Sequence, residues 1–301
     1  MPLNETDNQS MDTLSIIIIT YNEEPNIEIC LQSITWADEI IVVDCGSTDR
    51  TLEICNRYEK VSLFQEDREG SGAQKQHALD KANSMWVLNL DADESVSESL
   101  RLDIQNILEC PGQIDGYHVP RENYFLARHI KHAAGWGCDR PLRLFRRVKT
   151  SVTKTQVHET FVVDGSTGHL ESPLLHQAYK SLYQYIEKLN EYTSIEVRNR
   201  LKAQPGRKIT WIHILLAPMG TFWKMFVLHK GYRDGIQGLL LCLLSSVSVM
   251  LGYAKTWEYK MYRNLGNNEF PPIRTQEVRT RQPGYNQLIK GGDQEFMWED
   301  R

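Results

Sequence analysis

Four short apolar runs in the first hundred residues do most to limit the folds open to this chain. They cover residues 14–20, 39–45, 61–65 and 85–91. Each is rich in β-branched or other large apolar side chains and does not alternate with polar ones. Strands with this pattern are covered on both faces, which is typical of a parallel sheet between two layers of helices.

The segments between these runs have the spacing of helices. Ile27, Cys30 and Leu31 mark one apolar face, and further amphipathic helices are expected over 95–109 and 182–192. Strands that alternate with helices predict an α/β fold with a doubly wound, mostly parallel sheet flanked by helices. In such sheets ligands bind at the carboxyl ends of the strands.

Acidic loops follow three of the four runs, and they read TYNEE, DCGSTD and DADE. In DADE, Asp91 and Asp93 are alternate residues, which share a side in an extended segment and can face one ligand. Two hard oxygen donors suit Mg²⁺ or Mn²⁺, which in turn binds a diphosphate. The alternative is a solvated acidic turn, or an N-cap for the next helix supported by Glu94 and Ser95.

The other two loops offer groups that suit a nucleoside. Asp44 can accept hydrogen bonds from a base or a ribose, or it can cap the following helix, although Ser47 and Asp49 are also suited to that. Tyr21 offers a flat face for a base and Glu23 a further acceptor, while simple loop packing explains Tyr21 equally well.

A GSGA segment at residues 70–73 opens a helix that carries Lys75. Small residues permit close approach of the backbone, and the lysine adds a positive charge for a phosphate. The spacing matches neither a P-loop nor a dinucleotide-binding fingerprint.

His158 and Glu159 lie in an apolar, strand-like run. Val162 occupies the place of the second histidine of H-E-x-x-H, which excludes that zinc-protease motif. A carboxylate partly withdrawn from water is a candidate general base, and a salt bridge to an arginine is the alternative. His176 is more typical of a packed histidine. The nearby arginines suit either a phosphate or a solvated surface; they are Arg140, Arg143, Arg146 and Arg147.

Taken in order, these segments resemble family 2 glycosyltransferases with a GT-A fold. The matching stretches are SIIIITYNEEPNIEICLQSI, WADEIIVVDCGSTDRT, GSGAQKQHAL and WVLNLDADE, over roughly residues 13–180. WADEIIVVD, the VHE triplet and the helical C-terminal part are similar to the bacterial lipopolysaccharide-core β-1,4-glucosyltransferase subgroup. Lys75-Gln76 stands where the family usually has Arg-Asn, so a bidentate phosphate contact is not expected there.

The resemblance implies a role for each of these side chains. Asp93 and Asp91 would bind Mn²⁺ or Mg²⁺, and Glu159 would be the catalytic base. The residues that would bind the nucleotide are Thr20, Tyr21, Glu23, Asp44, Lys75 and Asp91. Acceptor contacts are expected from the 120–150 region, with three candidates: Trp136, Arg140 and Arg143.

The implied reaction moves one hexose, with glucose from UDP-glucose as the expected donor, to a glycolipid or lipopolysaccharide-core acceptor by an inverting displacement that forms a β-linkage. The Q-x-x-R-W motif of processive synthases is absent from the sequence. Three alternatives are open: a non-catalytic nucleotide-sugar or membrane-binding module, a polyprenyl-phosphate glycosyltransferase and a nucleotidyltransferase. The D-x-D pair and a candidate base argue against the first, and TYNEEPN lacks the Gly-rich signature of the last.

A stretch of twenty residues without a charge, Gly235 to Ala254, departs from the otherwise ordinary composition. It is long enough to span a bilayer, but basic residues flank both of its ends. A hairpin or interfacial helices on the cytoplasmic face of the inner membrane are expected, and a buried helix pair is the alternative. The net charge of -5 gives no support to a nucleic-acid partner.

Four parts are expected along the chain. They are a disordered N-terminus over 1–12, a catalytic domain over 13–205, an apolar helical membrane-associating region over 206–265 and a polar tail over 266–301. No basic segment followed by an apolar stretch opens the chain, so no secretory signal is expected. Six scattered cysteines predict reduced, mostly buried thiols of a cytosolic protein.

Overall fold

A computed structural model describes residues 12–66, 71–133, 139–153, 160–204 and 206–264. The chain divides into two compact units. The first comprises Met1–Arg121 and Asp139–His176, and the second comprises Glu122–Cys138 and Gln177–Arg301. The expected boundary after residue 205 stays a prediction, and the two expected terminal segments lie almost wholly outside the described residues.

A seven-stranded sheet with the order β12-β6-β9-β4-β1-β2-β3 forms the centre of the first unit. Its strands are β1 (Leu14–Thr20), β2 (Glu39–Asp44), β3 (Val61–Gln65), β4 (Trp86–Asp91), β6 (Gly116–His118), β9 (Leu142–Arg146) and β12 (Thr167–His169). The four apolar runs form β1 to β4, which pair in parallel, while β9 is antiparallel to β4 and β6. The predicted fold class, an α/β protein with a mostly parallel sheet, is confirmed.

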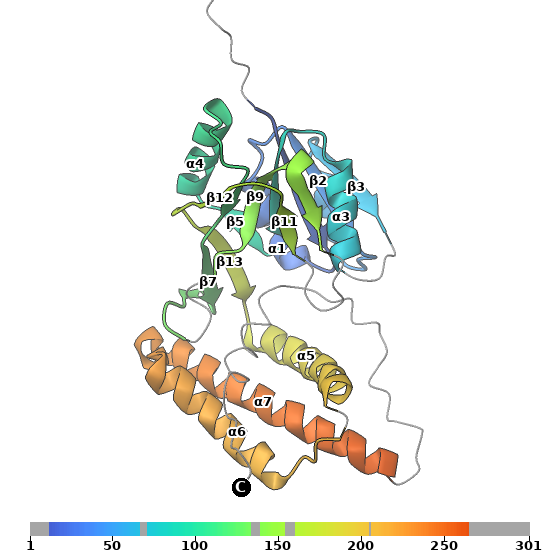
Figure 1. The fold of residues 1–301 in the computed structure, drawn as a ribbon, viewed down its shortest axis with the longest axis vertical. Helices are drawn as coiled ribbons and strands as arrows, with labels where there is room; N and C mark the ends of the chain where they lie inside the picture. The colour runs from blue at the N-terminus through green and yellow to red at the C-terminus, as the bar shows by residue number, and fades with distance from the viewer. Residues whose placement is uncertain (1–11, 67–70, 134–138, 154–159, 205, 265–301) are drawn as a thin grey trace, which may run out of the picture. The chain divides into compact units, whose positions relative to one another are not determined.

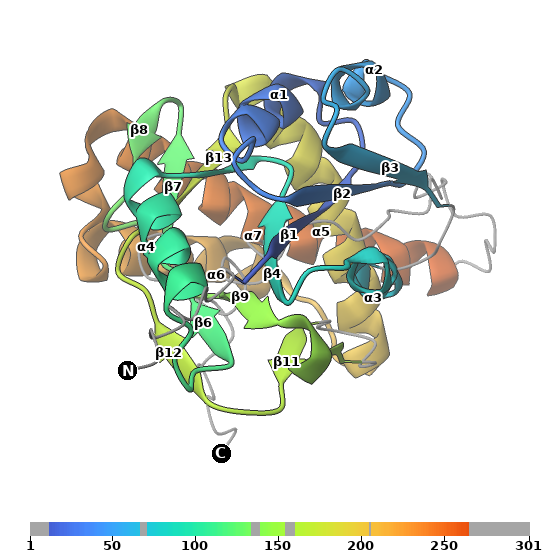
Figure 2. The same ribbon diagram turned by 90° about the horizontal axis from the view of Figure 1, so that it is seen from above.

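Both faces of this sheet are covered, as the lack of alternation predicts. In β1, Ile16 and Ile18 belong to one buried cluster, and Ile17 belongs to the other. Figure 2 shows α1 and α2 on one side of the strands and α3 on the other. The flanking helices are α1 (Glu24–Gln32), α2 (Thr51–Cys55) and α4 (Glu98–Glu109) at the first cluster, and α3 (Ser71–Lys81) at the second. Alternate residues of β1 therefore lie on opposite faces of the sheet and contribute to two separate buried clusters.

Two smaller sheets complete the strand arrangement. β10 (Thr150–Val152) and β11 (Phe161–Val163) form an antiparallel pair. The other sheet has the order β5 (Glu94–Val96), β13 (Leu174–Tyr179), β7 (Arg121–Phe125) and β8 (Arg128–His129). The chain passes from one unit to the other within β7 and β13.

Three helices make up most of the second unit. They are α5 (Leu182–Ala203), α6 (Trp211–Trp223) and α7 (Gly235–Asn264), with the short turns η2 (Lys224–Leu228) and η3 (Gly231–Asp234) between the last two. η2 is a π-helix that continues α6 directly, and η3 is a 3-10 helix. In Figure 1, α6 and α7 run side by side. Trp211–Leu228 and Gly231–Arg263 are long and apolar enough to cross a membrane by length and composition alone. The expected apolar C-terminal helices are therefore present.

Asp234 fastens a loop to the start of α7. Its buried carboxylate accepts hydrogen bonds from the backbone N–H groups of Lys131, His132 and Ala133 at 3.2, 2.9 and 2.8 Å. Its Oδ1 also lies 3.0 Å from His132 Nδ1. Burial opposes ionisation of this carboxyl, but the hydrogen bonds outweigh it and lower the pKa of Asp234.

Asp234→Asn is expected to lower the free energy of unfolding by about 2 kcal/mol, because an amide has one acceptor oxygen for these donors. Since the folded pKa lies below the ordinary value of 3.8, the carboxylate stabilises the fold at neutral pH. That contribution is lost as the pH falls through the folded pKa. Urea denaturation at neutral and acidic pH measures both effects, with Glu258→Gln in α7 as the control. Equal midpoints for Asp234→Asn and the wild type would contradict the assignment.

Candidate active site

The carboxyl ends of β4, β1 and β2 lie at one edge of the sheet. Thr20 is paired in register with Asp44, and Ile19 is paired with Asp91. Because the three strands are parallel neighbours, their following loops emerge on the same side. The structure therefore brings together predicted residues that are more than twenty positions apart in the sequence.

The loops after β1 and β2 are bound to each other. The backbone N–H of Asn22 donates to Ser47 Oγ at 2.8 Å, and Thr48 N–H donates to Asn22 Oδ1 at 2.8 Å. Glu23 N–H donates to Thr51 Oγ1 at 2.9 Å. Asn22 has a φ of 49°, a left-handed conformation that asparagine tolerates better than most residues. These hydrogen bonds hold the two loops together at the edge of the sheet.

Asp44 is fully buried and holds its own loop. Its Oδ2 accepts from the N–H groups of Gly46 and Ser47 at 2.8 Å each, and Ser47 Oγ donates to Oδ1. It does not cap α2, because that helix starts at Thr51, where Asp49 accepts from the Thr51 N–H. The capping alternative for Asp44 is therefore wrong.

The other residues predicted to bind the nucleotide lie at the end of β1 and in the loop after it, and they differ in exposure. Thr20 is 2 % exposed, and its Oγ1 has no hydrogen-bond partner among the described residues. Tyr21 is half-buried. Glu23 is buried and accepts from Asn26 Nδ2 at 2.7 Å. A buried hydroxyl without a partner is costly, so Thr20 is suited to a ligand that supplies one.

The Asp91–Asp93 segment is a turn and not the extended segment that the sequence suggested. Asp91 ends β4, and residues 92–93 form the turn before β5. Asp93 is only 3 % exposed, which excludes a solvated acidic turn. The N-cap of α4 is Ser97, whose Oγ accepts from the Leu100 N–H at 3.2 Å. Both structural alternatives for the acidic pair therefore fail.

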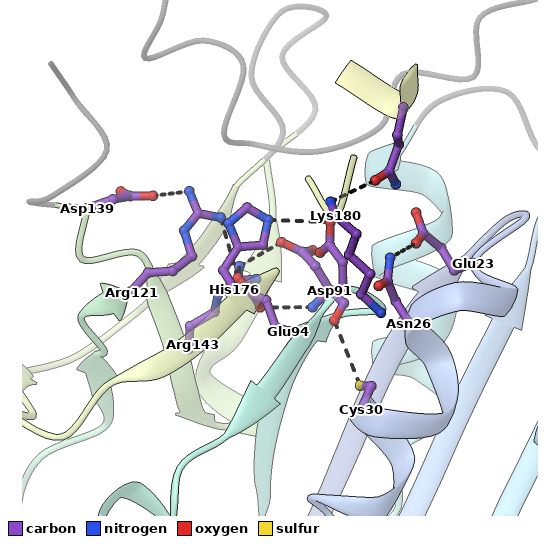
Figure 3. A network of polar contacts seen from close by, with 12 residues as sticks. Glu23, Asn26, Cys30, Asp91, Glu94, Arg121, Asp139, Arg143, His176 and Lys180 are labelled. Carbon is purple, nitrogen blue, oxygen red and sulfur yellow. Dashed lines mark hydrogen bonds and ion pairs between the residues drawn. The ribbon is translucent and has the colours of Figure 1, made fainter. Parts of the chain in front are cut away.

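A buried charge network surrounds this turn (Figure 3). Arg143 Nη2 donates to Asp91 Oδ2 and to Glu94 Oε1, both at 2.7 Å. Glu94 Oε2 accepts from the Asp91 N–H at 3.0 Å, and Arg121 links Glu94 to Asp139. The guanidinium of Arg143 is thus shared by two carboxylates from the same acidic loop.

Burial and the neighbouring charges shift the pKa values of the residues in this network. Burial opposes ionisation of Asp91, but the positive charges of Arg143 and Lys75 outweigh it and lower the pKa. Burial and the neighbouring Asp91 instead raise the pKa of Glu94. Burial disfavours the charged form of Arg143 too, yet the two carboxylates raise its pKa above the ordinary value. Asp91 and Arg143 are therefore an ionised pair at neutral pH.

Asp93 has a second kind of partner. His176 Nε2 lies 3.4 Å from Asp93 Oδ2, and both side chains are buried. The oxygens of Asp91 and Asp93 with this imidazole are a donor set that suits Mn²⁺, and the carboxylates alone suit Mg²⁺. Among the described residues, no three acidic, histidine or cysteine side chains are already gathered as a metal site. A cation here would need oxygens from a ligand, as one that bridges a diphosphate does.

Two comparisons show which known proteins the chain resembles. Residues 15–109 match the family described as glycosyl transferase family 2. This part of the chain is a domain of the glycosyl transferase family 2 type. It is similar to the lipopolysaccharide core biosynthesis glycosyltransferase LpsC of Rhizobium meliloti (strain 1021), with 28 % identity over 81 % of this chain and 92 % of that protein.

The chain is also similar to other known proteins. An uncharacterized glycosyltransferase of Rickettsia bellii (strain RML369-C) is 26 % identical over 89 % of this chain and 92 % of its own length. Among solved structures, S. aureus TarS in complex with UDP-GlcNAc covers 84 % of this chain and 92 % of its own. Its TM-score is 0.44 and its identity 15 %.

Lys75 and Gln76 of this glycosyltransferase lie on α3. Lys75 is buried, with its Nζ 5.9 Å from the centre of the Phe161 ring. Gln76 Oε1 accepts from the Val152 N–H at 3.2 Å, so this side chain holds β10 in place. The Lys75-Gln76 pair therefore supplies one positive charge, that of Lys75, which acts on Asp91 in addition to Arg143.

Glu159 and His158 of the glycosyltransferase lie outside the described residues, as does Trp136. The described residues on either side of 154–159 are bonded to each other. Thr153 N–H donates to Thr160 O, and Thr160 N–H donates to Thr153 Oγ1, both at 3.0 Å. The catalytic role of Glu159 stays a prediction.

The four arginines of the glycosyltransferase do not form one cluster. Only Arg143 enters the network around Asp91. Arg140 pairs with Glu171 at the surface, Arg146 lies over the Trp86 ring, and Arg147 Nε donates to Ser84 O. The surface alternative therefore holds for Arg140 and fails for Arg143.

Sequence reasoning missed several residues of the glycosyltransferase site. The sequence predicts Glu94 only as part of a helix cap and His176 only as a packed histidine, and it does not point to Arg121 or Asp139. The D-A-D-E string contains a signal for Glu94, since a third acidic residue there needs a counter-charge when buried. No sequence signal marks Arg121 or Asp139, because the partners of these residues are distant in the sequence.

Proposed function

We propose that this glycosyltransferase transfers a single glucose from UDP-glucose to a lipid-linked or lipopolysaccharide-core saccharide, with inversion, to form a β-linkage. The observation that carries the proposal is the acidic turn at the carboxyl edge of the sheet, where an ionised Asp91 adjoins buried Asp93. The similarity to LpsC over most of both chains supports the acceptor class. A polyprenyl-phosphate acceptor is the second candidate, and an acceptor screen separates the two.

The donor is proposed to lie across the strand ends. Asp44 and Tyr21 would take the uracil, with Glu23 nearby and the Thr20 hydroxyl supplying a hydrogen bond. Lys75 would neutralise part of the diphosphate. The partly filled bonding capacity of Asp44 and the unpartnered Thr20 Oγ1 support this placement.

Metal dependence is proposed from the donor set. Asp91, Asp93 and His176 would hold Mn²⁺ or Mg²⁺, which supplies positive charge to the leaving diphosphate. Of the charged groups gathered here, five are acidic and three basic: Asp44, Asp91, Asp93, Glu94 and Asp139 against Lys75, Arg121 and Arg143. An excess of negative charge in a buried site favours a divalent cation.

Glu159 is proposed as the general base. Its carboxylate would take the proton from the acceptor hydroxyl as that oxygen forms a bond to the sugar C1. The bond from C1 to the diphosphate oxygen breaks on the opposite face, and UDP leaves with the electron pair. A displacement with attack and departure on opposite faces inverts the anomeric centre, which converts an α-linked donor into a β-linked product.

The proposed location is the cytoplasmic face of the inner membrane, with the 206–265 region as a peripheral or hairpin attachment. Two apolar helices in that part of the chain and the lipopolysaccharide-core relative support it. An enzyme that joins a water-soluble nucleotide sugar to a lipid-borne acceptor has to work at that boundary. The catalytic part is proposed to extend over 13–205.

The direct test incubates the purified full chain with UDP-glucose, Mn²⁺ and solubilised lipopolysaccharide core lacking its outer sugars. Acceptor-dependent release of UDP and a product heavier by one hexose are expected. A chelator should stop the release, and added Mn²⁺ should restore it. Binding of UDP-glucose without release of UDP in the presence of any acceptor would favour the non-catalytic module.

Asp93→Asn is expected to abolish the effect of Mn²⁺ on UDP binding, because it removes the charge of a direct ligand. His176→Gln should weaken Mn²⁺ binding by about 10–100-fold and leave metal-free UDP binding unchanged. Calorimetric titration of UDP with and without Mn²⁺ measures both. Asp103→Asn on α4 is the control for Asp93, and His129→Gln is the control for His176. A wild-type Mn²⁺ response in either test variant would remove that residue from the metal site.

A further inference from the structure

One face of α6 consists of large apolar side chains without cover among the described residues. Five of them lie at helical spacing and are each more than half exposed: Trp211 (68 %), Leu215 (53 %), Leu216 (56 %), Met219 (65 %) and Trp223 (63 %). The opposite face packs on α7, where the rings of His213 and Tyr253 lie 5.6 Å apart and Pro218 is buried. An exposed apolar face of this size marks an interaction surface.

The second unit is strongly basic, in contrast to the chain as a whole. Its described residues (122–133, 177–204 and 206–264) contain fifteen lysines and arginines but six aspartates and glutamates, whereas the whole chain has a net charge of -5. Basic residues flank α6 at both ends: Arg207 and Lys208 before it, and Lys224, Lys230 and Arg233 after it. The partner of the apolar face therefore has to be compatible with positive charge on both sides.

We propose that α6 lies in the plane of an anionic lipid bilayer, with its apolar face at the acyl boundary and its basic flanks among the headgroups. A helix with an apolar face, cationic flanks and tryptophan at its ends has the composition of an interfacial anchor. The inference rests on the proposed association of the enzyme with the membrane. It selects peripheral attachment over a spanning hairpin.

The position of a charge argues against a span. α6 continues through η2 to Leu228, and the eighteen residues Trp211–Leu228 extend about 27 Å, close to the hydrocarbon thickness of about 30 Å. Lys224 lies inside this helical segment, so a charge would enter the core if the segment were moved across it.

The packing of α7 argues against a span as well. Its thirty residues are long enough, but its second half packs against the charged helix α5. Lys255 Nζ lies 2.8 Å from Asn190 Oδ1 and from Thr193 Oγ1, and the Arg200 guanidinium stacks 3.9 Å from the Tyr253 ring centre. Placing this part of α7 in hydrocarbon would take the charges of α5 with it, at a cost that a peripheral position avoids.

A second copy of the chain fits the same face less well. Two α6 helices packed face to face would bring basic flanks together at both ends of the contact, where like charges repel. Anionic headgroups supply the opposite charge at both ends. Charge complementarity therefore favours the lipid surface.

The test measures binding of the full chain to vesicles, without donor or acceptor. We expect sedimentation with phosphatidylcholine vesicles that contain about 30 % phosphatidylglycerol and not with phosphatidylcholine alone, together with loss of binding as salt increases. The bound protein should be released by alkaline carbonate. Equal binding to neutral vesicles, binding to neither, or retention after carbonate would each overturn the inference.

Two sets of variants locate the surface. Leu215→Ser with Leu216→Ser should abolish vesicle binding, while Leu102→Ser on α4, an exposed leucine of the first unit, should not. Lys208→Gln and Arg233→Gln should each weaken binding about five-fold, with Arg50→Gln as the control. Wild-type binding by the α6 variant, or a dimer in sedimentation equilibrium that this variant dissociates, would overturn the proposal. UDP release is assayed separately in detergent solution, so failure of vesicle binding leaves the proposed reaction intact.

Discussion

Glu159→Gln is expected to slow sugar transfer by about 10²–10⁴-fold while UDP-glucose binding stays at the wild-type level. Glutamine keeps the size and the polarity of the side chain but cannot accept the proton of the attacking hydroxyl at neutral pH. The loss should therefore fall on kcat, with little change in donor affinity. Steady-state transfer kinetics and a titration of UDP-glucose separate the two quantities.

Asp164→Asn provides the matched control. This carboxylate is exposed and lies five residues after Glu159, so the substitution makes the same acid-to-amide change nearby. Wild-type transfer is expected from it. Near wild-type transfer from Glu159→Gln with normal donor binding would show that another group takes the proton.

Arg143→Met is expected to lower the free energy of unfolding by about 3–5 kcal/mol and to abolish transfer. The substitution leaves the carboxylates of Asp91 and Glu94 buried without the guanidinium that both contact at 2.7 Å. Their mutual repulsion then disrupts the acidic turn. Urea denaturation monitored by circular dichroism measures the loss of stability.

Arg140→Met is the control for this prediction. Arg140 lies three residues earlier and pairs with Glu171 at the surface, where solvent screens the interaction, so little change in stability is expected. Arg143→Lys keeps the charge but not the contact with both carboxylates. Its free energy of unfolding should lie between those of Arg143→Met and the wild type. An unfolding midpoint of Arg143→Met equal to that of Arg140→Met would mean that the network contributes no stability.

The strands and the identity of the acidic loops followed from the sequence. β1, β2, β3 and β4 begin and end within one residue of the predicted apolar runs, because a continuous β-branched run has few stable conformations other than a buried strand. Their parallel order then dictates that Thr20, Asp44 and Asp91 meet at one edge. Local pattern and global fold agree at this part of the chain.

The details of the acidic turn did not follow from the sequence. An extended Asp91–Asp93 segment was expected, and the structure has a turn in which Asp91 pairs with Arg143 and Asp93 with His176. These partners are fifty-two and eighty-three positions away along the chain. Periodicity reports which face of an element is buried, but it does not report which distant side chain lies against that face.

The same division applies to the C-terminal helices. The amino-acid pattern alone predicts an α/β sheet with acidic strand ends, and an apolar region flanked by positive charge. The packing of the helices is needed to show that α6 exposes its apolar face while α7 is held against the charged helix α5. Composition sets how much apolar surface a helix carries, whereas packing against neighbouring helices determines how much of that surface stays exposed.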